Sequence, residues 1–203
     1  TNNARISALA SAKSSLSTFS TALTELLKST SYNGQPVSND TSVATVSLIS
    51  GGVPKGLPAQ LEVQQLAKAQ VLQSATLADT TTVAGTGSLT LTVGTTTKTI
   101  TLASPNNTLA DLASAINASD AGVTASIVKD QNGARIVIKG ETGLAKAFTL
   151  TANADADTDL PRFTWDGTTG GLTRSQTAQN ALIKIDNVAM EFGTNEVSGA
   201  IPY

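Results

Sequence analysis

The side chains that most often carry chemistry are scarce in this sequence. Its 203 residues include no cysteine and no histidine. Without cysteine there is no disulfide, thiolate nucleophile or zinc–thiolate site. Without histidine, the commonest general base and the commonest transition-metal ligand are missing. Catalysis would have to rest on carboxylates, lysine or tyrosine, so we expect a protein that is not an enzyme and that needs no cofactor.

One acidic stretch has the spacing of a calcium-binding loop. Asp155, Asp157 and Asp159 alternate along the chain, and Asp166 stands at the twelfth position. The sixth position holds Leu160 instead of the glycine that the sharp turn of such a loop requires. We therefore interpret the stretch as a solvated acidic loop and predict no metal site.

Other candidate chemical groups are dispersed. The glycine-rich stretches 85–87 and 167–171 do not connect a buried strand to a helix, so we interpret them as turns instead of phosphate-binding loops. The remaining carboxylates of interest fall in unrelated elements, although a glycosidase-like pair stays open from spacing alone. These carboxylates are Glu62, Asp111, Glu141 and Glu191.

The single tryptophan, Trp165, lies beside Phe163 in a polar stretch. It could be an exposed anchor for a partner. We favour a plug at the edge of a small core, because tryptophan is highly buried on average.

Composition narrows the function classes further. Aromatic residues make up only 3% of the chain, so its core must be built from Val, Ile, Leu and Ala. The net charge is -2 and no basic stripe exists, which argues against nucleic acid and against an anionic membrane surface as partners. The apolar runs are too short to span a bilayer. We expect the sequence to be a piece of a longer protein.

The first 30 residues predict a long helix. They contain no glycine or proline, and the turn-forming residues 32–36 follow. Apolar residues recur at steps of three and four, as in the seam of a coiled coil. One interpretation is an amphipathic helix that packs on its own domain. We favour a second interpretation, one helix of a multi-helix leg, because so long a helix cannot bury its seam alone. The predicted seam residues are Leu9, Leu16, Phe19, Leu23 and Leu26, with Ala12 between them.

Alternation of period two then predicts strands. Residues 43–48 and 61–64 alternate, whereas 66–72 also satisfy a helical spacing and stay ambiguous. Further on, four alternating stretches pair into two predicted hairpins, and two more flank the turn Asp186–Asn187. These stretches are 88–93 with 98–102, 123–129 with 134–139, and 181–185 with 188–192, and another strand is expected at 147–151.

A capped helix lies between the first two hairpins. Thr108 is a good N-cap residue, and Asp111 stands where a capping box places its acid. The buried stripe of this helix would be formed by Leu109, Leu112, Ala113 and Ile116. We expect the helix to end between Asn117 and Gly122.

The predicted fold class is α+β: an N-terminal coiled-coil-type helix followed by two β-rich domains, one inserted in the other. The inner domain would contain a hairpin–helix–hairpin unit. We expect the helical leg to begin with residues 1–48. The outer β-rich domain would comprise 49–80 and 153–203, and the inserted α+β domain 81–152.

Several stretches together resemble a known family. Residues 108–117, 122–126, 136–138 and Gly143 resemble the repeat of flagellins and hook-associated proteins. Three further stretches are similar to hook-associated protein 2, the family of flagellar filament caps, and appear in the family's order. They are 61–70, 181–186 and 195–202. Tyr203 departs from the family, which usually continues with Gly-Val.

The resemblance implies a secreted protein at the distal tip of the bacterial flagellum, exported through the flagellar apparatus. It implies a homo-oligomeric ring that helps flagellin fold and polymerise beyond the hook–filament junction protein. Some members of the family also act in adhesion. Two alternatives stay open: another flagellar axial protein, and a bacterial adhesin or carbohydrate-binding β-module.

Overall fold

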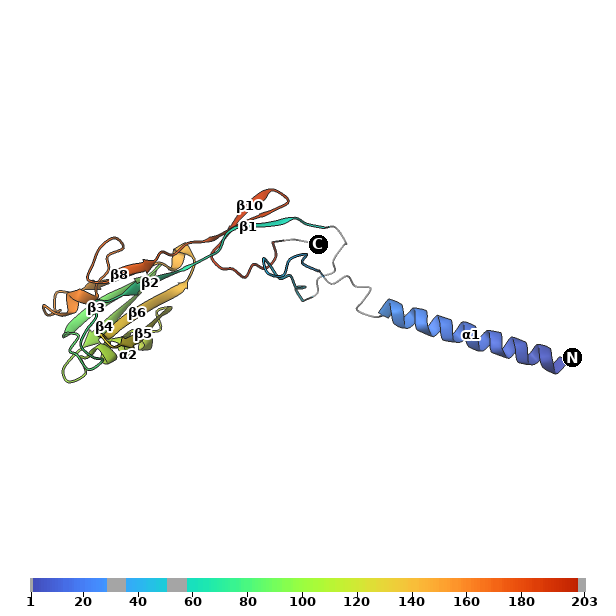
Figure 1. Cartoon of the computed structure of the whole chain (residues 1–203), viewed down its shortest axis with the longest axis horizontal. Helices are drawn as coiled ribbons and strands as arrows, with labels where there is room; N and C mark the ends of the chain where they lie inside the picture. The colour runs from blue at the N-terminus through green and yellow to red at the C-terminus, as the bar shows by residue number, and fades with distance from the viewer. Residues whose placement is uncertain (1, 29–35, 51–57, 201–203) are drawn as a thin grey trace. The chain divides into compact units, whose positions relative to one another are not determined.

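The structure, a computed structural model, describes residues 2–28, 36–50 and 58–200, and the side chains within them except those of 2–4 and 25–28. The chain divides into two compact units. One comprises 1–59 with 198–203, and the other comprises 60–197. Figure 1 gives the order of their elements along the chain. The fold is α+β, as the sequence predicts.

The first unit contains one long helix, α1, which spans Asn2–Lys28. Its hydroxyl-bearing side chains turn back onto the helix: Thr18, Thr21 and Thr24 each donate to the carbonyl oxygen four residues earlier, at 2.9, 2.9 and 2.7 Å. These bonds satisfy the threonine hydroxyls without any tertiary partner.

The prediction of a strand at residues 43–48 is wrong. Residues 36–50 form no strand in the structure. Instead, the Asp40 carboxylate accepts from the N–H and hydroxyl of Ser42, and the Asp40 carbonyl accepts from Val43 and Ala44. Period-two alternation predicts a strand only where a neighbouring strand supplies the hydrogen bonds. Within the described residues no strand pairs with 43–48, and the turn at Asp40 occupies the N–H groups of its first two residues.

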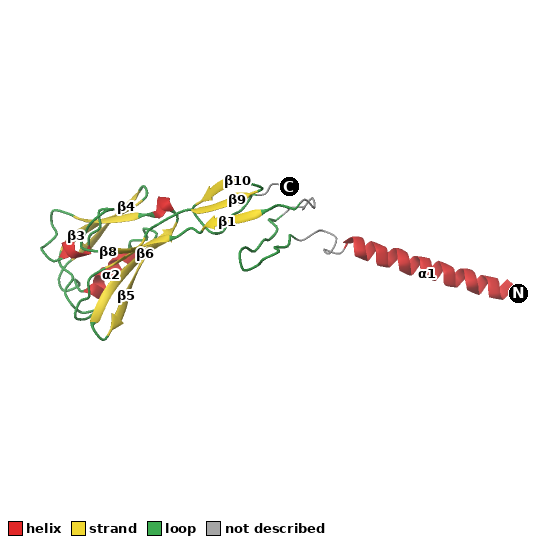
Figure 2. Cartoon of the chain, turned by 45° about the horizontal axis from the view of Figure 1, so that its top comes forward, coloured by secondary structure: helices red, strands yellow, loops and turns green. Residues whose placement is uncertain are grey.

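The second unit contains two larger antiparallel sheets (Figure 2). One has the order β5-β6-β2-β8 and the other β4-β3-β7. We call these two sheets, with helix α2 and the connections among them, the body. The bounds of the elements are β2 Ala69–Gln73, β3 Gly87–Val93, β4 Thr96–Leu102, α2 Leu109–Ala118, β5 Val123–Asp130, β6 Gly133–Thr142, β7 Phe148–Ala152 and β8 Thr173–Gln176, with short 3-10 turns η1 Leu144–Lys146 and η2 Leu160–Phe163.

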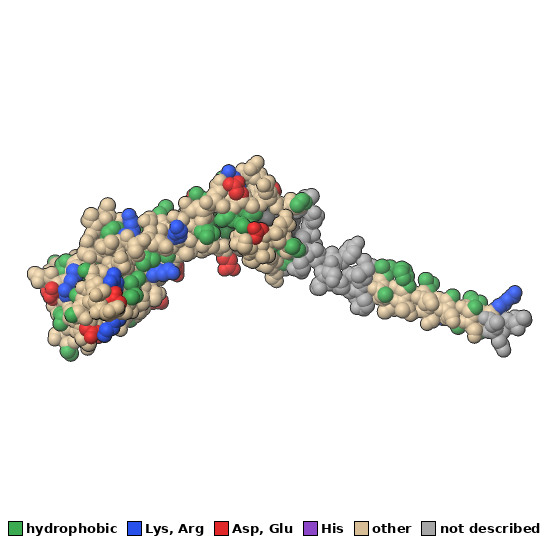
Figure 3. All heavy atoms as spheres, in the orientation of Figure 1, with side chains coloured by type: hydrophobic (Ala, Val, Ile, Leu, Met, Phe, Trp, Pro, Cys, Tyr) green, Lys and Arg blue, Asp and Glu red, His purple; other side chains and the backbone are tan. Residues whose placement is uncertain are grey.

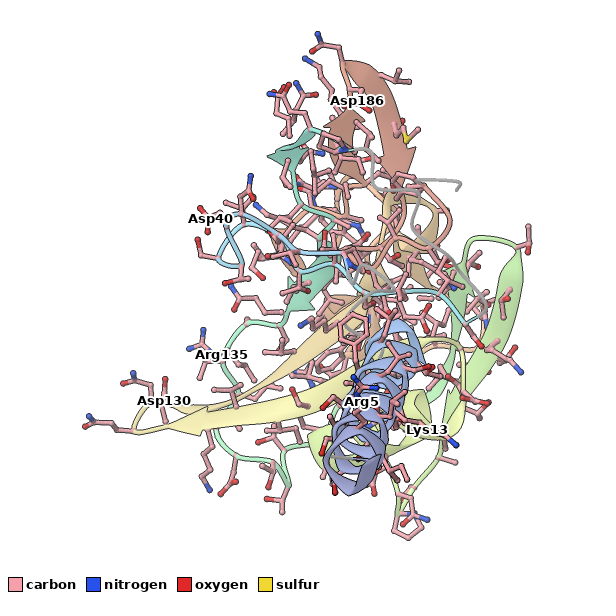
Figure 4. All side chains as sticks on the ribbon, turned by 90° about the vertical axis from the view of Figure 1, so that its right-hand side faces the viewer. Arg5, Lys13, Asp40, Asp130, Arg135 and Asp186 are labelled. Atoms are coloured by element: carbon pink, nitrogen blue, oxygen red, sulfur yellow. The ribbon has the colours of Figure 1, made fainter. Side chains whose placement is uncertain are left out.

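A small sheet of three strands, with the order β1-β9-β10, joins the body. Its strands are β1 Leu61–Gln65, β9 Ala181–Ile185 and β10 Val188–Phe192. Asp186 and Asn187 have positive φ and form the tight turn between β9 and β10, as predicted. The carboxylate of Asp186, labelled in Figure 4, accepts from the N–H of Gln60 and so holds the start of β1.

The body has one apolar core, whose members lie between Leu72 and Leu172. Aliphatic residues supply most of it, with Phe148, Phe163 and Trp165 as its aromatic members. Helix α2 buries Leu109, Leu112, Ala113 and Ile116, and contacts β4, β5 and β6. The predicted aliphatic stripe of this helix is therefore its packing face.

Strands from outside the expected inserted domain complete its sheet. β2 pairs with β6, and β8 pairs with β2 on its other side. Leu72, Phe163 and Leu172 also lie outside 81–152 and belong to the same core. The division into 49–80 with 153–203 and 81–152 stays a prediction about domains, but the strand pairing favours wider limits, near 67 and 178.

Candidate interaction surfaces

Helix α1 carries an exposed apolar stripe. Leu9 and Leu16 are each 69% exposed, Phe19 is 64% exposed and Leu23 is 44% exposed. Figure 3 shows apolar side chains along one side of this helix. The side chain of Leu26 lies outside the described residues. Because apolar area left in water costs about 25 cal/mol per Å², a stripe of this kind is typical of an interface.

The helix of the body begins with the predicted capping box. The hydroxyl of Thr108 accepts from the N–H of Asp111 at 3.2 Å, and the Asp111 carboxylate accepts from the N–H of Thr108 at 2.9 Å. The Thr108 hydroxyl also donates to this carboxylate at 2.7 Å and, with the N–H bond, lowers the pKa of Asp111. The cap therefore fixes where α2 starts over the sheet.

Two amide side chains pair with main chain in the way that a strand does. Gln70, which is 3% exposed, donates to the carbonyl of Phe148 at 2.8 Å and accepts from its N–H at 3.2 Å. This pair joins β2 of one sheet to β7 of the other. Asn117, at the end of α2, makes a similar pair of hydrogen bonds with the main chain of Ala125 on the edge strand β5, at 2.9 and 2.8 Å. Sequence reasoning missed both, because no local pattern indicates a main-chain partner elsewhere in the fold.

The acidic loop uses its carboxylates to hold main chain. Asp157 accepts from the N–H groups of Thr86, Asp159 and Leu160, at 2.6, 3.0 and 3.0 Å. The bonds from Leu160 and Thr86 lower the pKa of Asp157 most. Asp166 similarly accepts from the N–H groups of residues 168 and 169. Within the described residues, no three acidic side chains are grouped as metal ligands would be.

The other carboxylates considered from the sequence lie on four different elements, β1, α2, β6 and β10. Each has a partner of its own: Glu62 with Lys184 at 3.8 Å, Asp111 with Thr108, Glu141 with Lys146 at 2.7 Å, and Glu191 with Asn180 at 2.6 Å.

Trp165 closes one side of the body core, as favoured from the sequence. It is only 6% exposed, and its main chain pairs with Leu150 at 2.6 and 2.8 Å. The Arg174 guanidinium lies 5.3 Å from the centre of its ring. Trp165 is therefore part of the packing and not an exposed anchor.

The described helices include the long α1 and the shorter α2. None of them is both long enough and apolar enough to cross a membrane.

The chain has similarities to known proteins both in its first 70 residues and over nearly its whole length. Residues 1–70 match the family described as flagellar hook-associated protein 2 N-terminus. The flagellar hook-associated protein 2 of Escherichia coli K12 is 33% identical over 203 residues, covering 96% of this chain and 43% of the relative. The chain belongs to the flagellar hook-associated protein 2 family. Residues 88–142, which contain the capped helix and both flanking hairpins, also match the flagellin hook IN motif.

Solved structures of hook-associated protein 2 have the same fold. The D1-D2-D3 domains of the flagellar cap protein FliD from Escherichia coli match with a TM-score of 0.65 at 33% identity, over 71% of this chain and 43% of that one. The D2-D3 domains from Serratia marcescens match with a TM-score of 0.64 at 28% identity, over 70% of this chain and 81% of that one. The B-type protein of Pseudomonas aeruginosa is 30% identical over 99% of this chain and 45% of its own length. The chain thus spans less than half the length of these curated relatives.

Proposed function

We propose that this chain is part of a structural protein that caps the distal tip of the bacterial flagellar filament and promotes the folding and polymerisation of flagellin. Its family membership supports the proposal, as does its similarity to structures titled flagellar cap proteins. The mechanism is steric and requires no reaction or cofactor: a ring of copies encloses a space in which exported flagellin docks. The location outside the cell and contact with the hook–filament junction protein belong to the same proposal.

The observation that carries the proposal is the exposed stripe of Leu9, Leu16, Phe19 and Leu23 on α1. The hydroxyls of Thr18, Thr21 and Thr24 are already bonded to the helix itself, so the apolar side is the one that needs a partner. We infer that this side, extended by Leu26, is the seam of a helical leg. In the complete protein, another helical segment or another copy would cover it.

The test changes the seam in the full-length protein. We expect Leu16→Ser with Leu23→Ser to weaken ring formation, measured by electron microscopy, and swimming of a strain that lacks its own cap gene. The control changes the opposite side of α1 with little change in volume, as Ser14→Thr with Thr21→Ser, and should leave rings and swimming intact.

Normal rings and normal swimming in the Leu16 and Leu23 variant would contradict the seam. Failure of the unmodified full-length protein to support filament growth, together with binding to a glycan array, would instead favour the adhesin alternative.

A further inference from the structure

The small sheet and the body are linked by two adjacent antiparallel segments, which we call the joint. One segment comprises 65–68 and the other 178–181. Between them, Lys68 and Gln179 exchange main-chain hydrogen bonds of 2.9 and 3.1 Å. The main chains of the two segments make this one pair, and the side chain of Gln179 also donates to the carbonyl of Leu66 at 2.8 Å. The stiffness of the joint therefore depends on the side chains that tie it as well as on its main chain.

Asn195, which follows β10, ties one side of the joint. Its side-chain oxygen accepts from the N–H of Ala67 at 2.7 Å, and its amide nitrogen donates to the Ala67 carbonyl at 3.0 Å. Ala67 is buried, at 4% exposed. These two hydrogen bonds therefore satisfy both main-chain polar groups of Ala67, a residue of the joint, with an amide from the segment that follows the small sheet.

Asn180 bridges the two parts directly. Its side-chain oxygen accepts from the N–H of Leu144 in the body at 2.7 Å, and its nitrogen donates to Glu191 of β10 at 2.6 Å. Its main-chain carbonyl accepts from the side chain of Gln65 at 2.7 Å. One residue therefore holds the body, the small sheet and the joint together.

A close main-chain approach lies beside these amides. Gly143 has a φ of +105°, and a Cβ there would lie 2.6 Å from the carbonyl oxygen of Gly193. The N–H of Gly143 also donates to the carbonyl of Lys68 at 3.2 Å. The corner of the body at 143–144 is thus pressed against the end of β10, which leaves little space for the joint to bend in that direction.

We propose that Asn180 and Asn195 lock the small sheet and the body into one rigid lever and fix the angle between them. The two amides add connections that the strand pairing alone does not make: to the main chain of Leu144 and Ala67, and to the carboxylate of Glu191. This goes beyond the proposed capping function and holds whether or not the chain caps a filament.

The absence of cysteine from the sequence makes a distance measurement direct. Ala189→Cys on β10 and Ser126→Cys on β5 place one spin label on each part, both at exposed positions. Pulsed electron paramagnetic resonance of the full chain should give one narrow distance distribution. Asn180→Ala with Asn195→Ala should widen the distribution at least twofold. The control, Asn132→Ala in the turn between β5 and β6, should leave its width unchanged.

A distribution as narrow in the double variant as in the parent would overturn the proposal. Near-ultraviolet circular dichroism of Trp165 reports whether the body stays folded. If the double variant loses that signal, Asn195→Asp takes its place, since it keeps the acceptor for the Ala67 N–H and loses the donor to the Ala67 carbonyl. An intermediate width in Asn195→Asp supports the proposal, and a parental width overturns it.

Discussion

Several amide side chains in this protein form paired hydrogen bonds with main chain, as a neighbouring strand would. Gln70 is the most buried of these amides. Leucine at this position would keep much of the volume but would leave the N–H and carbonyl of Phe148 without their side-chain partner. A buried main-chain group that loses its partner costs about 1–3 kcal/mol. We therefore expect Gln70→Leu to lower the free energy of unfolding by about that amount in urea denaturation.

The matched control for Gln70→Leu is Gln73→Leu on the same strand. Gln73 is half-buried, and its side chain makes no hydrogen bond among those of the described residues. Its replacement should change the free energy of unfolding by less than about 0.5 kcal/mol. Equal effects of the two substitutions would mean that the pairing with Phe148 contributes nothing specific.

The capping box gives a second prediction for single residues. Thr108→Ala removes the hydroxyl that accepts from Asp111 and should destabilise the body by about 0.5–2 kcal/mol, measured by thermal or urea unfolding. Thr108→Ser keeps the hydroxyl and should restore most of the loss. Ser114→Ala, at an exposed position within α2, controls for helix propensity. Unchanged stability of Thr108→Ala would argue against the cap as the start of the helix.

At the scale of elements, sequence patterns correctly predicted the helices and hairpins that are determined by residues close together in the chain. The hairpins β3–β4, β5–β6 and β9–β10 and the capped helix α2 are confirmed, because turn residues and caps act over a few positions. The ambiguous stretch 66–72 contains all but the last residue of β2, whose partners β6 and β8 lie about 70 and 100 residues further along the chain.

The candidate surfaces were predictable to a similar degree. The stripe on α1 could be read from its spacing, and the structure describes it as exposed from Leu9 to Leu23. Gln70, Asn117, Asn180 and Asn195 could not, because each side chain bonds groups that only the finished fold brings near. The strand expected at 43–48 failed for the related reason that alternation does not specify a partner.

The limits of the folding unit follow from the pairing of elements. A fragment of residues 60–197 retains both larger sheets, the small sheet and the whole core, so we expect it to unfold cooperatively in urea when followed by circular dichroism. A fragment of 81–152 lacks β2, β8, Leu72 and Phe163 and should show no cooperative transition. Cooperative unfolding of the shorter fragment would support the narrower limits expected from the sequence alone.

At the scale of the whole molecule, several aspartates make stability depend on pH. Hydrogen bonds to the ionised carboxylates lower the pKa values of Asp111, Asp157 and Asp166, and Lys129 is the main cause for Asp79. A carboxyl whose pKa is lower in the folded state stabilises that state above the unfolded pKa of about 4. This contribution is lost as the pH falls through the folded pKa.

We therefore expect the urea midpoint to be nearly constant between pH 7 and pH 5 and to fall between pH 4 and pH 2. Asp157→Asn should be less stable than the parent at pH 7 and should lose less stability on acidification. A parent protein that is equally stable at pH 7 and pH 2 would show that these carboxylates are not coupled to folding.

The adjacency of Lys68 and Gln179 affects how a protein of this kind can evolve. Because the chain leaves the small sheet and returns to it through residues that share two hydrogen bonds, everything between them is a single loop closed at its base. Insertions are tolerated where the two ends lie close together at a surface. The body could therefore be enlarged, shortened or exchanged for a foreign module, and a fluorescent or affinity domain grafted between these two positions should leave the small sheet intact.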